Sequence, residues 1–82
     1  MDMQKWEYIF LVAYRVDQGW KVGMVNGKEL ANWKIGPSLY DFLNQRGVEG
    51  WELVNVTFAP IFTQTGFVDT EDYRLVMKRI KD

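Results

Sequence analysis

The stretch from Trp6 to Val16 constrains the fold of this chain more than any other segment. It is rich in β-branched and aromatic residues and holds no Gly or Pro, a composition typical of a β-strand. Its even-numbered positions are all apolar, and its odd-numbered positions include Ile9, Leu11 and Ala13. Because successive side chains of a strand point to opposite faces, both faces are largely apolar. The pattern therefore predicts a central strand that is covered on both sides.

Turn residues and further alternating segments predict three more strands. Asp17-Gln18-Gly19 has the chemistry of a turn, and Asn26-Gly27 is a strong signal for a second, tight turn. Lys28 to Leu30 could extend that hairpin by a few residues. Pro60 either ends regular pairing or places its end of the strand at a sheet edge. After the first strand, the predicted strands cover residues 20–25, 51–59 and 73–80.

One helix is predicted to begin near Pro37, which is favoured at a first helical position, or one residue later with Ser38 as the cap. Gly47 is expected to end it in a left-handed conformation. A helix of about ten residues must pack on a sheet to be stable. The order β-β-α-β-β indicates an α+β fold, an antiparallel sheet with one short helix packed on one face, in a single domain over residues 1–82. The apolar face of the predicted helix carries Leu39, Phe42 and Leu43.

The chain has no His and no Cys, which excludes disulfides, thiol chemistry, His–Cys zinc sites and Ser–His or Cys–His nucleophiles. Carboxylates remain at Glu49, at Glu52 and in the acidic segment 69–72, but such clusters are usually solvated turns. We therefore expect no catalytic residue, no metal site and no cofactor. No segment approaches the roughly 20 apolar residues of a membrane span. The absence of Cys fits a cytoplasmic protein without membrane contact.

Aromatic residues are the outlier of the composition, with four Trp, four Tyr and five Phe in 82 residues. One short helix covers only one sheet face, so some rings should contact a second subunit, a protein partner or a small ligand. The alternative is that rings replace aliphatic residues in a small core. We expect a non-enzymatic binding module that forms a homo-oligomer, most simply a dimer. The candidate contact residues are Tyr8, Phe10, Tyr14, Trp20 and Trp33.

Two other functions stay open at the level of sequence. The first is a small-molecule protein that stacks a nucleotide-like ligand on Trp20, Trp33 or Tyr8. The second is a platform for single-stranded nucleic acid, in which aromatic residues of the first strand lie near the basic residues of segment 74–81. The net charge of −1 argues against nucleic acid as a general partner, because attraction to phosphate is then weak.

Two segments resemble the hallmarks of a known family. Residues 5–8 read KWEY, and residues 43–54 read LNQRGVEGWELV. Together they resemble a small bacterial and phage family, the domain of unknown function 4177, whose closing strand ends in basic residues as residues 73–79 do here. The resemblance implies a strand, a short helix and two further strands, and it implies no activity.

Overall fold

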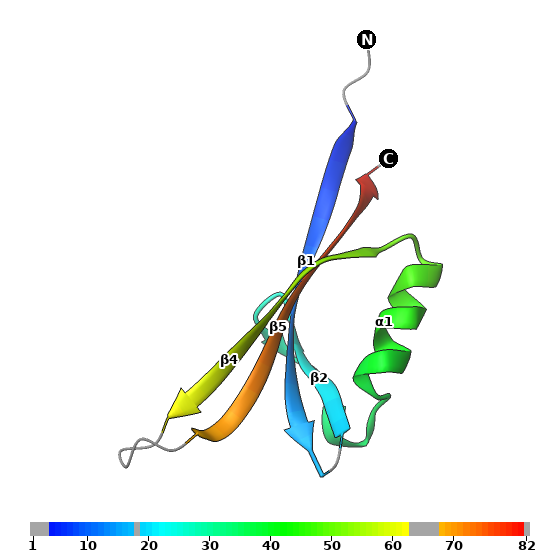
Figure 1. Ribbon diagram of the computed structural model, residues 1–82. Coiled ribbons are helices and arrows are strands. Elements are labelled where there is room, and N and C mark those ends of the chain that lie inside the picture. The colour runs from blue at the N-terminus through cyan, green and yellow to red at the C-terminus, as the bar shows by residue number, and fades with distance from the viewer. Residues whose placement is uncertain (1–3, 18, 63–67, 82) are drawn as a thin grey trace.

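The computed structural model describes residues 4–17, 19–62 and 68–81, with the backbone alone over 59–62 and 68–71. Over these residues the chain forms a five-stranded antiparallel sheet with one α-helix (Figure 1). The strand order across the sheet is β3-β2-β1-β5-β4. Along the chain the elements are β1 (Lys5–Val16), β2 (Gly19–Val25), β3 (Lys28–Glu29), the 3₁₀-helix η1 (Trp33–Ile35), α1 (Leu39–Val48), β4 (Glu52–Phe62) and β5 (Val68–Lys81).

The α+β class with an antiparallel sheet is confirmed, but the predicted order β-β-α-β-β is wrong because it lacks a strand. The short β3 pairs with the end of β2 and completes the hairpin that the turn at Asn26 and Gly27 begins. Both turn residues have positive φ, 52° and 83°, as a type I′ hairpin turn requires. The N–H of Leu30 then donates to the Gly23 carbonyl at 2.8 Å. The possible extension of this hairpin is therefore real.

The first predicted strand is central, because β1 lies third of five in the sheet. Its pairing with β5 runs without a shift from Lys5 opposite Lys81 to Tyr14 opposite Asp72. Its pairing with β2 begins only at Leu11. The pairing of β4 with β5 begins at Glu52 opposite Lys78, so the ends 5–7 of β1 and 79–81 of β5 run together beyond the rest of the sheet, toward the two termini (Figure 1).

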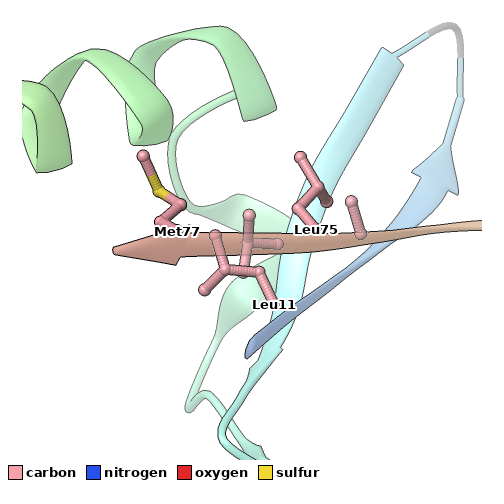
Figure 2. Close-up of a cluster of buried hydrophobic side chains, with 5 residues drawn as sticks. Leu11, Leu75 and Met77 are labelled. Carbon is pink, nitrogen blue, oxygen red and sulfur yellow. The ribbon is translucent and has the colours of Figure 1, made fainter. Parts of the chain in front are cut away.

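The hydrophobic core lies where β1, β2 and β5 meet beneath α1. Figure 2 shows Leu11, Leu75 and Met77 grouped where β1 and β5 lie side by side. The pairing of Leu11 with Leu75 places their side chains on the same face of the sheet. The apolar residues predicted for the helix are half-buried and pack against this cluster. The buried apolar side chains of the core are those of Leu11, Ala13, Val22, Leu75 and Met77, and the helix contributes Leu39, Phe42 and Leu43.

The two ends of α1 differ in how well the sequence predicted them. Ser38 is the N-cap, and its hydroxyl oxygen accepts a hydrogen bond from the Asp41 N–H at 3.2 Å. The alternative start is therefore confirmed, and the start at Pro37 is wrong. Gly47 does not end the helix, which continues to Val48. The left-handed residue is instead Gly50, whose φ is +94°.

β4 is the outermost strand on one side of the described sheet. It was predicted to stop at Ala59, but it continues to Phe62, with Pro60 paired to Glu71. The expectation that Pro60 marks an edge is confirmed, because β4 lies at the end of the strand order. An edge strand tolerates a residue without an N–H. A bulge at Val54 interrupts the ladder between β4 and β5. β5 likewise begins earlier than predicted, at Val68 rather than Tyr73.

Candidate interaction surfaces

The sheet face opposite α1 carries a group of apolar residues, of which all but the half-buried Val76 are exposed. We call it the open face and define it as Trp6, Tyr8, Phe10, Val76 and Ile80. Register places them together, because Trp6 lies opposite Ile80 and Phe10 opposite Val76. Tyr8 is 52% exposed and Phe10 is 57% exposed. The prediction that β1 is covered on both sides is therefore wrong for a single chain, since α1 packs on the other side of the sheet (Figure 1).

A cation lies within the open face. Lys78 is opposite Tyr8 in the register, and its Nζ lies 4.3 Å from the centroid of the Trp6 ring. That distance is typical of a cation–π contact. The same Nζ lies 3.4 Å from Oε1 of Glu52, so the charge of Lys78 is shared between a ring and a carboxylate. The open face is therefore aromatic along β1 and becomes polar toward β4, where Lys78 and Glu52 lie.

Tyr14 and Trp33 contact each other at the other end of that sheet face. Their ring centroids are 5.2 Å apart. The Tyr14 hydroxyl donates to the sulfur of Met24 at 3.1 Å, and the Trp33 indole N–H donates to Oε1 of Glu29 at 3.2 Å. These four residues line a hollow of about 230 Å³. The segment around η1 therefore folds over Tyr14 and leaves the Tyr8 and Phe10 end of the face exposed.

Trp20 lies on the opposite side of the sheet from the other candidate aromatics. It pairs with Arg15, which places it on the face that α1 covers. Its ring centroid is 4.4 Å from that of Tyr73, and Tyr73 is in turn 5.3 Å from Phe58. The five predicted contact residues therefore do not form one site. The structure brings Tyr8 next to Phe10 and Tyr14 next to Trp33, and it separates Trp20 from both pairs.

A second apolar surface lies along β4, and its residues are not among the predicted contact residues. We call it the β4 flank and define it as Leu53, Val54, Val56 and Phe58, all between 43% and 49% exposed. Leu53, Val56 and Phe58 point to the α1 side, since they pair with Met77, Leu75 and Tyr73. α1 makes its main sheet contacts with β2, which leaves this side of β4 uncovered. A signal was present, because residues 53–62 contain no charged side chain.

The residues of the two hallmark segments meet around Arg79. Its guanidinium forms an ion pair with Glu7 and lies 4.3 Å from the centroid of the Trp51 ring. One terminal nitrogen also donates to the backbone carbonyl of Glu49 at 3.2 Å. Arg79 of β5 thus connects β1, the end of α1 and the entry to β4.

The family model for the domain of unknown function DUF4177 matches residues 6–80. The chain belongs to the DUF4177 family. No match was found among curated proteins or among solved structures. The hallmarks of this DUF4177 chain have a structural explanation. Gly50 turns the chain with its positive φ, and the ring of Trp51 makes a cation–π contact with Arg79 of β5.

Two of the candidate carboxylates of the DUF4177 chain lie beside cations, while the side chains of residues 69–71 lie outside the part that the structure describes. Glu49 lies 3.2 Å from Arg46, and Glu52 lies 3.4 Å from Lys78. Among the residues that the structure describes, no group of three or more carboxylates could hold a metal ion. Within the same residues, no helix is long and apolar enough to cross a membrane.

Proposed function

We propose that the chain is a non-enzymatic cytoplasmic binding module that assembles as a homo-oligomer, most simply a dimer, and uses the open face to bind a protein or a small ligand. The observation that carries this proposal is the exposure of Tyr8 and Phe10, 52% and 57%, side by side with further apolar residues. Contiguous apolar surface of this kind is typical of an interaction site.

The apolar side chains that α1 leaves exposed also favour assembly. α1 covers the core over β1, β2 and β5 but leaves apolar side chains exposed on both sheet faces, on the open face and on the β4 flank. A second copy of the chain presents the same surfaces and is always available to cover one of them. One surface is then free for a different molecule.

Sedimentation velocity at micromolar concentration tests the assembly. We expect a species with twice the mass of the 9.7 kDa chain. A strict monomer across that range would overturn the homo-oligomer.

The binding role of the open face needs a probe and matched variants. The apolar dye 1-anilinonaphthalene-8-sulfonate should bind the folded protein, because its rings fit an exposed aromatic surface. The double substitution Tyr8→Ser with Phe10→Ser should weaken that binding, since the β4 flank remains. The control is Tyr40→Ser, since Tyr40 is 75% exposed on α1, away from the open face. Equal dye binding by both variants would show that the open face is not the binding surface.

A nucleotide-like ligand is a second candidate, and Lys78 favours it. A base could stack on Tyr8 or Phe10 while the Lys78 ammonium, 4.3 Å from the Trp6 ring, lies close enough to attract a phosphate. Titration with nucleoside monophosphates and with a short oligothymidylate should then quench tryptophan fluorescence, less so in Lys78→Gln and in high salt. Unchanged fluorescence with every ligand would exclude this candidate.

A further inference from the structure

We propose that two copies of the chain join through β4, which pairs antiparallel with β4 of the second copy across a two-fold axis, so that the two sheets become one. This inference rests on the proposed dimer and says which surface forms it.

The backbone of β4 is an unprotected edge. β4 is eleven residues long and outermost in the described sheet, so one row of its N–H and C=O groups points away from β5. Natural edges are usually protected by charged side chains or by being very short. On the opposite side of the sheet, the outermost strand follows that rule, since β3 has only two residues, Lys28 and Glu29, and both are charged. β4 does not, because segment 53–62 carries no charge.

The side chains of β4 match those of a second β4. Residues directly opposite each other in an antiparallel pair lie on the same face. On the α1 side, Val56 and Phe58 are 43% and 44% exposed, so pairing brings apolar residues against apolar residues. On the other side, Thr57 lies opposite Thr57 of the second copy, where the two hydroxyl groups can form a hydrogen bond, and Asn55 lies opposite Ala59. No like charges are opposed, because this segment has none.

Two features of β4 limit where the pairing can occur. The bulge at Val54 interrupts the regular ladder at one end. Pro60 has no N–H to donate at the other end. The segment between them, residues 55–59, is the regular part of the edge, with Thr57 at its middle. A two-fold axis near Thr57 places Val56 opposite Phe58 of the second copy.

This self-complementarity is the reason to assign the surface to a second copy rather than to a different protein. The two-fold axis is perpendicular to the sheet, so both α1 helices lie on the same face of the joined sheet. Between them the exposed part of the β4 flank forms the floor of a trough. The ring row of Phe58, Tyr73 and Trp20, with centroid distances of 5.3 Å and 4.4 Å, extends that floor in each copy. The open faces lie on the other side of the sheet and stay accessible.

The test compares three substitutions by sedimentation velocity. Val56→Lys places a charge at an exposed position of the proposed interface, and we expect the dimer dissociation constant to rise by about tenfold or more, because the change enters the interface twice. Phe10→Ser changes the open face and Tyr40→Ser changes α1, and both should stay dimeric. Circular dichroism checks that each variant is folded.

A second measurement covers the case in which Val56→Lys fails to fold. In the unmodified protein, amide hydrogen exchange within residues 55–59 should slow as the protein concentration rises, because pairing protects the outward N–H groups. Exchange that is independent of concentration in a protein that dimerises would overturn the inference.

The outcomes separate this inference from the proposed function. A dimer that survives Val56→Lys, or that only Phe10→Ser dissociates, would show that β4 is not the interface while the homo-oligomer stands. A monomeric unmodified protein would overturn both. Loss of the dimer in Val56→Lys alone supports both.

Discussion

At the scale of single residues, Arg79 has the largest structural role that can be tested. It pairs with Glu7, donates to the Glu49 carbonyl and lies over the Trp51 ring. Arg79→Gln removes the charge and the ring contact, so we expect the free energy of unfolding to fall by about 1–3 kcal/mol. Urea unfolding followed by tryptophan fluorescence measures it. The control is Lys81→Gln, an exposed cation of the same strand, and an equal effect of both would contradict this role.

Gly23 shows how one missing side chain admits an aromatic pair. A Cβ at this position would lie 2.7 Å from the Tyr14 ring and 3.1 Å from the Trp33 ring. Gly23→Ala should therefore displace both rings and destabilise the fold by about 1–3 kcal/mol. Near-ultraviolet circular dichroism should report the altered ring packing. Gly19→Ala is the matched control in the same strand, since a Cβ there meets nothing within 4 Å, and it should leave both measurements nearly unchanged.

At the scale of elements, the helix shows what local sequence can and cannot predict. Its start was predictable because Ser38 caps it with its own side chain. Its end was not, because α1 closes in a Schellman motif that lies three residues beyond the first glycine. The N–H of Trp51 donates to the Arg46 carbonyl at 3.1 Å, and that of Gly50 donates to the Gly47 carbonyl at 3.0 Å. Gly47 and Gly50 could each have ended the helix, and Gly50 is the one that turns the chain toward the start of β4 at Glu52.

The two glycines make a sharp test of that correction. Gly50 has a φ of +94°, so Gly50→Ala should be strained and should lower the free energy of unfolding by about 1–2 kcal/mol. Gly47 is inside α1, and Gly47→Ala should instead raise it by about 0.5–1 kcal/mol. Urea or thermal unfolding measures both. If Gly47→Ala were the destabilising change, the helix would end where the sequence first indicated.

Strands could be predicted where residue composition and turn residues determine them. They could not be predicted where hydrogen-bonded pairing with a neighbouring strand determines their length. β1 and the turn at Asn26 and Gly27 follow from composition and turn residues. The extra length of β4 and β5 does not, because Pro60 argues against a strand unless that strand is known to be an edge. Edge position is a property of the whole sheet.

At the scale of the whole molecule, the five predicted contact residues lie on different faces of the sheet. The face on which a residue lies depends on how its strand is paired with the neighbouring strand. The even-numbered residues of β1 were correctly expected to share a face, since alternation within one strand is fixed. Trp20 follows a turn, and its face is set by its pairing with Arg15. The register between β1 and β2 also shifts between Val12 and Ala13, because Val12 lies opposite Met24 and Ala13 opposite Val22. Local alternation therefore places residues within a strand, and only the folded sheet relates one strand to the next.

The assembly makes a last prediction about stability. An 82-residue chain buries a small core, here five buried apolar side chains among the residues that the structure describes, so apolar contact with a second copy should add to its stability. Because association then favours the folded state, the unfolding midpoint should rise by about 3–5 °C for each tenfold increase in protein concentration. Scanning calorimetry over a hundredfold range measures this slope. Val56→Lys should lower the midpoint and flatten the slope, whereas Tyr40→Ser should change neither. A flat slope in the unmodified protein would mean that the chain folds without help from a second copy.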